Sequence, residues 1–193
     1  MDIIKKLAQE LAIKEEQAKA AVQLIDEGNT IPFIARYRKE MTGALNDETL
    51  RNLHERLLYL RNLEEKKEQV INAITDQGKM TEDLKKKILS AETLVAVDDL
   101  YRPYRPKKQT RATKAKEKGL EPLANILLLQ KTTKSMEEEA AAFVNAEKGV
   151  ANAKEAIAGA KDIIAEMIAD MADYRKSIRN CTMKQGSLVV KAK

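Results

Sequence analysis

The stretch NDETLRNLHERLLYLRNLEEKKEQVINAITDQG, residues 46–78, decides the fold class of this chain. Its apolar residues recur every three or four positions and form one seam: Leu50, Leu53, Leu57, Leu60, Leu63, Val70 and Ile74. That spacing is typical of an amphipathic helix with one buried face. Asn46 and Asp47 suit the first turn of such a helix, and Gly78 suits its end. The stretch therefore predicts a rod of roughly 30 residues, about 45 Å long at 1.5 Å per residue.

The same periodicity continues on both sides of this stretch. Further helices are expected over residues 2–13, 15–27, 30–41, 81–89, 120–129, 136–144 and 150–178. Only 7 glycines and 4 prolines occur in 193 residues, which agrees with a chain that is mostly helical. The expected fold class is all-α: a multi-helix bundle with two long helices and a helix-turn-helix-like N-terminal part.

The last residues depart from the helical pattern. Residues 186–193, GSLVVKAK, are rich in β-type residues, and no other segment reads as a partner strand. We therefore expect them to begin a strand of a further domain in a longer protein. The expected domains are residues 1–45, the small helical part; residues 46–185, the helical region with two long helices and a basic loop at 100–118; and residues 186–193.

Positive charge is concentrated in the middle of the chain. The net charge is +5, yet residues 101–118 alone contain eight lysines and arginines and a single acid, Glu117. A local basic cluster of this kind can follow a phosphate backbone. The candidate nucleic-acid-binding residues are Arg102, Arg105, Lys107, Lys108, Arg111, Lys114, Lys116 and Lys118.

The aromatic residues of the same segment have two interpretations. Tyr101 and Tyr104 suit either stacking on bases or anchoring of the loop. In the second case Pro103 and Pro106 would help to pin the connection while the lysines are merely solvated. Composition alone leaves both interpretations open.

A second basic group decorates the helix expected over residues 30–41. Arg36, Arg38 and Lys39 are further candidates for nucleic-acid contact, beside Tyr37. The alternative is a polar helix face whose arginines pair with internal carboxylates such as Glu40.

Motifs of catalysis and metal binding are missing from the sequence. It has no phosphate-binding glycine loop, no HExxH, no CxxC and no serine elbow. His54 and Cys181 each occur alone, and a single cysteine forms no internal disulfide. Asp98 and Asp99 stand just before two arginines, so ion pairing or helix capping is favoured over a metal. We expect no catalytic residue, no metal and no cofactor, and therefore a chain that is not an enzyme.

Targeting signals are missing as well. No run of about 18 apolar residues occurs, and the N-terminus has no signal-peptide hydrophobic region. The chain is expected to be cytoplasmic, without a membrane partner.

Two strings resemble a known family. TIPFIARYRKEMTGALNDETLRNLHERLLYLRNLEEKK, residues 30–67, closely resembles the opening of the bacterial Tex family, the transcription accessory proteins. DDLYRPYRPKKQTRATKAKEKGLEPLA, residues 98–124, is similar to the other N-terminal signature of that family, and AKDIIAEMIAD, residues 160–170, fits the same pattern. The resemblance implies a much longer protein, in which a ribonuclease H-like domain, helix-hairpin-helix modules and an OB-type RNA-binding domain follow this helical region.

The function implied is sequence-tolerant binding of RNA or DNA in transcription, through the cations above. The alternative is a structural and protein-interaction scaffold that orients the downstream nucleic-acid-binding domains without binding nucleic acid itself. The expected partners are nucleic acid, the downstream domains of the full-length protein and the transcription machinery.

Overall fold

The computed structural model describes residues 2–106 and 108–191 of the chain. Helices form all of its named elements in these ranges, and a single isolated β-bridge joins Asn145 to Val150. The all-α class is therefore confirmed. The chain divides into two compact units, Met1–Val97 and Asp98–Lys193.

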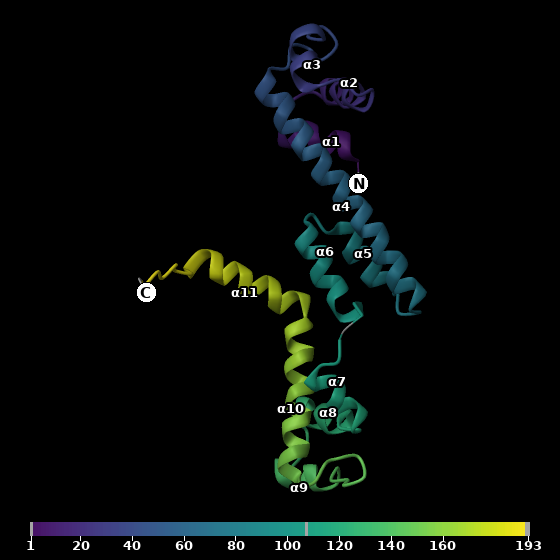
Figure 1. Ribbon diagram of the computed structural model, residues 1–193, viewed down its shortest axis with the longest axis vertical. Helices are drawn as coiled ribbons and strands as arrows, with labels where there is room; N and C mark the ends of the chain where they lie inside the picture. Colours follow the sequence, from purple (N-terminus) through teal and green to yellow (C-terminus); the bar gives the residue numbers. More distant parts are fainter. Residues whose placement is uncertain (1, 107, 192–193) are drawn as a thin grey trace. The chain divides into compact units, whose positions relative to one another are not determined.

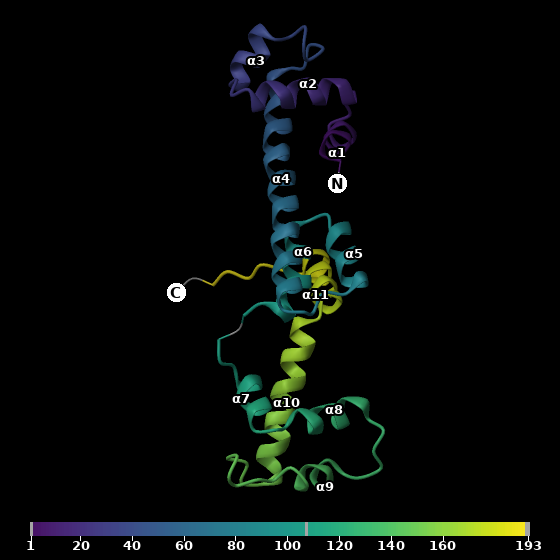
Figure 2. The ribbon, with the colours of Figure 1, turned by 90° about the vertical axis from the view of Figure 1, so that its right-hand side faces the viewer.

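The first unit is built on one long helix. Its elements are α1 (Ile3–Glu10), α2 (Glu15–Asp26), α3 (Ile31–Tyr37), α4 (Asp47–Asp76) and α5 (Glu82–Ser90). Figures 1 and 2 show α1, α2 and α3 gathered around the first half of α4, while α5 lies beside its second half. Every residue of the predicted apolar seam of α4 is buried, so the long helix confirms the expectation from residues 46–78.

The ends of α4 follow from local chemistry. The Asn46 side chain accepts a hydrogen bond from the backbone N–H of Thr49 at 2.7 Å, which satisfies one unpaired donor of the first turn. Gly78, just beyond the helix, has a φ of +66°, a left-handed conformation that glycine adopts without steric cost. Both expected signals are confirmed.

The second unit is built on a shorter helix. Its elements are η1 (Arg102–Tyr104), α7 (Arg111–Glu117), α8 (Glu121–Leu129), α9 (Met136–Ala141), α10 (Ala153–Asp170) and α11 (Ala172–Gln185). The helix α6 (Leu94–Tyr101) leads from the first unit into the second. Helices α7, α8 and α9 all pack on α10 (Figures 1 and 2).

Small residues bring α7 and α10 close together. Ala112 and Ala115 of α7 are buried, as are Ala156 and Ala160 of α10. A Cβ atom added at Gly159 would lie 3.2 Å from the Ala115 Cβ of α7 and 2.4 Å from the side chain of Leu120, which follows α7, so a glycine is what permits this approach. The position of α7, and with it the basic segment, depends on this contact.

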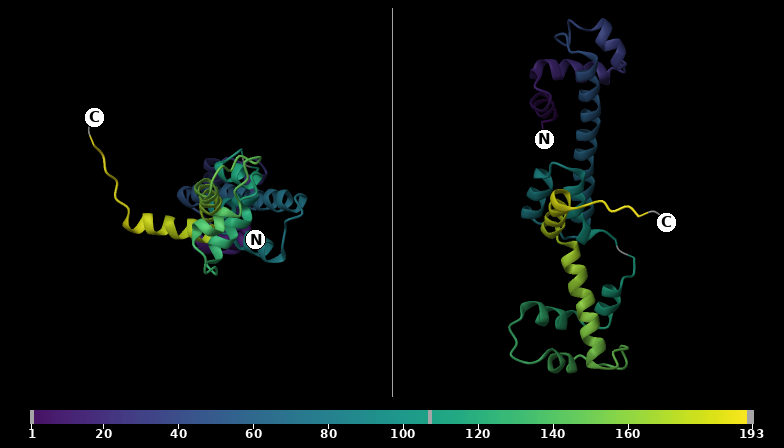
Figure 3. Two further views of the ribbon diagram at one scale, coloured as in Figure 1. Left: turned by 90° about the horizontal axis from the view of Figure 1, so that it is seen from below. Right: turned by 90° about the vertical axis from the view of Figure 1, so that its left-hand side faces the viewer.

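The second long helix predicted over residues 150–178 is wrong in length. The helix ends at Asp170, Met171 has an extended backbone, and α11 then runs in a new direction, as Figures 1 and 3 show. No glycine or proline marks the break, and the apolar periodicity continues through it. The bend coincides with ion pairs that Asp170 and α11 make with residues far away in the sequence.

One smaller expectation needs correction, and another stays a prediction. Residues 94–101, where no helix was expected, form the helix α6. The residues after Gly186 form no strand within the described part of the chain, because a strand requires a hydrogen-bonded neighbour and none lies there. Residues 192–193 of that expected strand lie outside the described residues.

Candidate nucleic-acid interface

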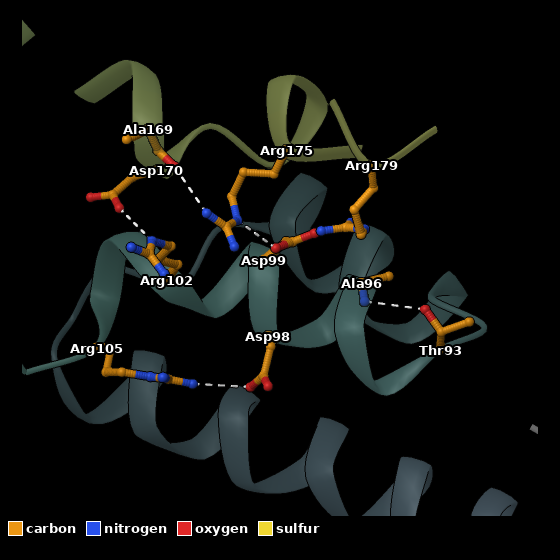
Figure 4. Close-up of polar contacts among 10 residues, drawn as sticks. All are labelled: Thr93, Ala96, Asp98, Asp99, Arg102, Arg105, Ala169, Asp170, Arg175 and Arg179. Atoms are coloured by element: carbon orange, nitrogen blue, oxygen red, sulfur yellow. Dashed lines mark hydrogen bonds and ion pairs between the residues drawn. The ribbon is translucent and has the colours of Figure 1, made fainter. Parts of the chain in front are cut away.

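The two arginines of the YRPYRP segment make internal ion pairs. The Arg102 Nε donates to the Asp170 Oδ1 at 2.8 Å, and the Arg105 Nη2 donates to the Asp98 Oδ1 at 3.0 Å. The Arg105 guanidinium also lies over the Tyr101 ring, 5.6 Å from its centroid. Figure 4 shows both pairs, which tie this segment to the end of α10 and to α6.

The most buried carboxylate of this region is Asp99, on α6, whose side chain is only 6% exposed. Its Oδ1 accepts from the Arg175 Nε at 2.7 Å, and its Oδ2 accepts from the Arg179 Nη2, both from α11 (Figure 4). Burial acts to raise the pKa of Asp99, but the hydrogen bonds from Arg179 and Arg175 outweigh it and hold this pKa below its ordinary value. Asp99 is therefore a charged strut between α6 and α11.

The expectation for the acidic pair is partly confirmed. Asp98 does pair with Arg105, seven residues away. Asp99 instead takes two arginines 76 and 80 residues away, while Arg102 pairs with Asp170. Sequence reasoning missed these partners because no local spacing relates them.

The tyrosines and the central lysine of the segment are placed as follows. Tyr101 and Tyr104 are both half-buried in the α6–η1 turn, so neither ring is fully presented to solvent. Lys107, a candidate contact, lies outside the described residues.

The remaining cations lie on or beside α7. The Thr110 side chain caps this helix by accepting from the N–H of Thr113 at 3.0 Å, which fixes its start at Arg111. Because Ala112 and Ala115 face the core, positions 111, 114 and 118 share the outer side of the helix. Lys108 precedes the helix and lines a separate groove with Arg102 and Arg105. We call Arg111, Lys114 and Lys118, together with Lys108, the α7 face.

None of the cations of the α7 face makes a close ion pair with a described carboxylate. The Arg111 side chain is 87% exposed and lies 3.5 Å from Asp162, a pair that contributes little. Lys118 donates to the backbone oxygen of Gly149 at 2.7 Å. Lys108 and Lys114 are exposed and have no carboxylate partner among the described residues. Lys116 lies apart from this face and pairs with Glu121 at 3.3 Å.

A groove of about 260 Å³ runs along this surface. Arg111, Lys114 and Lys118 line its α7 side, and Glu155 and Asp162 line its α10 side. A phosphate backbone would therefore meet the cations on the rim nearest α7, since the acids of α10 would repel it from the other rim.

The second basic group belongs to the first unit. Arg36, Arg38 and Lys39 are all exposed, and none of them pairs with a carboxylate in the described part of the chain, Glu40 included. The Arg38 guanidinium lies 5.3 Å from the centroid of the Phe33 ring. The ion-paired alternative for this group is thus not what the structure shows.

Other candidate chemistry is sparse. His54 is half-buried on α4 and Cys181 is exposed on α11. No cluster of three or more His, Cys, Asp or Glu residues among the described positions is arranged to hold a metal ion. Within the same ranges, none of the helices has the length and apolar character to cross a bilayer.

Comparison with known proteins gives consistent matches along the chain. Residues 1–75 match the Tex-like protein N-terminal domain, and residues 131–193 match the Tex central region-like family; together the two matches cover more than half of the chain. Protein YhgF of Escherichia coli is 48% identical over 183 residues, which are 95% of this chain and 24% of that protein.

Two further relatives carry descriptive names. The transcriptional accessory protein Tex of Neisseria gonorrhoeae is 45% identical over 93% of this chain and 23% of its own length. The human S1 RNA-binding domain-containing protein 1 is 32% identical over 95% of this chain and 18% of its own length. The chain thus spans about a quarter, or less, of the relatives it matches.

Proposed function

This chain belongs to the Tex family, and we propose on that premise that it contributes a sequence-tolerant contact with nucleic acid to a transcription accessory protein. The contact is made by the α7 face, through the phosphate backbone. It is a binding role without catalysis, in a cytoplasmic protein.

The observation that carries this proposal is the exposure of the α7 cations. Lys108 and Lys114 have no described carboxylate partner, and Arg111 is 87% exposed. An exposed cation releases condensed counterions when it neutralises a phosphate, and that release is the main source of non-specific affinity. Arg102 and Arg105 are already paired with carboxylates, so we assign them to holding the segment in place.

The experiment is a fluorescence-anisotropy titration of RNA and DNA at several salt concentrations. The triple variant Lys108→Gln, Arg111→Gln and Lys114→Gln should bind more weakly, and the magnitude of the slope of log K against log salt should fall by up to about 2–3, because each of the three lost phosphate contacts removes roughly 0.7–0.9. Helicity should not change, since these side chains are exposed.

A matched control removes the same charge elsewhere. Lys79, Lys85 and Lys86 are exposed in the first unit, outside both basic groups. Their triple replacement by glutamine should leave the salt slope nearly unchanged. If both triple variants lower the slope equally, the binding reflects net charge and the α7 face is no site.

A second candidate function, a scaffold for other domains, is favoured by an apolar surface on the second unit. Ile168, Tyr174 and Ile178 line a groove of about 530 Å³ along the α10–α11 bend, and Ile178 is 65% exposed. A contiguous exposed apolar surface marks a protein contact. On this proposal its partner is the downstream part of the full-length protein, with the transcription machinery as a further partner.

The scaffold role has its own test in the full-length protein. If downstream domains cover this groove, Ile178→Glu should weaken that contact. The boundary between this chain and the downstream domains should then become more sensitive to limited proteolysis. Lys176→Glu, an exposed position on the same helix, is the control. Equal proteolysis of both variants would count against the scaffold proposal. It would not affect the proposal that the α7 face binds nucleic acid.

A further inference from the structure

Helix α3 and the two residues that follow it combine exposed aromatic rings with cations. Phe33 is 36% exposed and Tyr37 is 65% exposed, although large aromatic side chains are usually mostly buried. Arg36, Arg38 and Lys39 surround them. We call these five residues the α3 face.

The fold directs the α3 face outward. Ile34 is fully buried in the core of the first unit, whereas Phe33 and Tyr37 on the same helix are exposed. Phe33 and Tyr37 are four residues apart, so they lie on one side of the helix, with ring centroids 5.3 Å apart and planes tilted by 45°. The Arg38 guanidinium covers part of the Phe33 ring, whereas most of the Tyr37 ring is open to solvent.

The segment that follows α3 is held firmly. Thr42 is fully buried, and its hydroxyl donates to the backbone oxygen of Arg38 at 3.2 Å. The Gln17 Nε2 donates to the backbone oxygens of Thr42 and Gly43, at 3.2 and 2.9 Å. The backbone that carries the cations of the α3 face is therefore ordered before any ligand arrives, which reduces the entropy cost of binding.

An open ring beside unpaired cations suits a ligand that offers both flat bases and phosphates. In a duplex the bases stack on one another and cannot reach an exposed side chain, whereas the bases of a single strand are free to stack on aromatic rings. An acidic protein would satisfy the cations but would leave the ring of Tyr37 unused.

We propose that the α3 face binds single-stranded nucleic acid, with a base stacked on Tyr37 and the neighbouring phosphates held by Arg36, Arg38 and Lys39. This deepens the proposed function, since it rests on nucleic acid being the partner and names the form of nucleic acid. The α7 face, which offers cations only, does not distinguish single strands from duplexes.

A tryptophan reporter tests the stacking directly. The natural chain contains no tryptophan, so Tyr37→Trp places the sole indole on the α3 face. The whole 193-residue variant is titrated with oligouridylate, oligothymidylate and an abasic strand, each of about 12 nucleotides, a length within the range of known single-strand sites. Quenching by the two base-bearing strands and none by the abasic strand is the expected result; comparison of uridylate with thymidylate separates RNA from DNA.

Two controls accompany the reporter. Tyr174→Trp places an indole at a 51% exposed position of the second unit and should show no base-dependent quenching. Poly-glutamate supplies negative charge without bases. If poly-glutamate or the abasic strand changes the Tyr37→Trp signal as much as oligouridylate does, the α3 face is a docking site for acidic ligands and the stacking proposal is wrong.

Affinity measurements separate this site from the α7 face. Tyr37→Ala should weaken binding of a single strand roughly tenfold, leave binding of the abasic strand and of a duplex unchanged, and leave the salt slope unchanged. Tyr37→Phe should bind like the natural chain. If the α7 triple variant loses its salt slope while Tyr37→Ala binds every strand normally, the proposed function stands and the α3 proposal fails. If Tyr37→Ala weakens single-strand binding while the α7 triple variant keeps its salt slope, the α3 proposal stands and the α7 face is no site.

Discussion

Replacing Asp99 by asparagine should destabilise the second unit by about 2 kcal/mol. Removing one partner of a buried ion pair typically costs about 3–5 kcal/mol. The Asp99 side chain is 6% exposed, but Arg175 and Arg179 are 33% and 40% exposed, so water compensates part of the loss. Asparagine keeps the shape and one acceptor, which also lowers the cost.

Urea unfolding of the whole chain, followed by circular dichroism, measures this effect. In a thermal melt of the same variant, a loss of 2 kcal/mol in a unit of fewer than 100 residues corresponds to a fall in Tm of roughly 10 °C. Because the chain has two units, the traces should be fitted with separate transitions if two are resolved.

The pH dependence gives a second reading of the same variant. The folded pKa of Asp99 is lowered, so its stabilisation is complete above the unfolded pKa of about 3.9 and is lost as pH falls through the folded value. The difference between the natural chain and Asp99→Asn should therefore be largest near neutral pH and shrink in acid.

Asp98→Asn is the matched control. Asp98 and Arg105 are 48% and 49% exposed, and such a pair contributes at most about 1 kcal/mol. If the two variants are equally stable at neutral pH, or if the cost of Asp99→Asn does not shrink in acid, the account of Asp99 as a charged strut is refuted.

Two further changes test how the helices are built, each read by urea unfolding. Gly159→Leu should cost about 1–3 kcal/mol, because the new side chain would overlap Leu120 and Ala115, the second of which belongs to α7. Ala158→Leu, at an exposed position, should be nearly neutral, and equal costs would contradict the close α7–α10 contact. Asn46→Ala should cost about 1 kcal/mol, because it removes the side-chain cap of α4. Thr30→Ala is the control and should cost little, since the Thr30 side chain makes no capping hydrogen bond. A neutral Asn46→Ala would show that the cap is dispensable.

The candidate site was only partly predictable. The charge count located the basic segment, because composition is visible along the chain. It did not separate Arg102 and Arg105, which are paired with carboxylates, from Lys108 and Lys114, which are not. That distinction depends on Asp170, which lies 68 residues from its partner Arg102.

The α3 face shows the opposite case. The sequence identified its cations, but no local signal in the sequence decides whether they pair with Glu40. Only the burial of Ile34 and Thr42 shows which side of the segment faces the core, and hence that Tyr37 and its neighbours face solvent.

The sequence by itself determined the helices whose signals are local. The seam from Leu50 to Ile74, the cap at Asn46 and the glycine at position 78 specify α4 without reference to any distant residue. The tertiary structure alone decided where the second long helix ends and which cations are free. At Met171 the apolar period continues, and no breaker residue interrupts it. The new direction of α11 accompanies the pairing of Arg175 and Arg179 with Asp99, and contacts across 76 and 80 residues leave no trace in local periodicity.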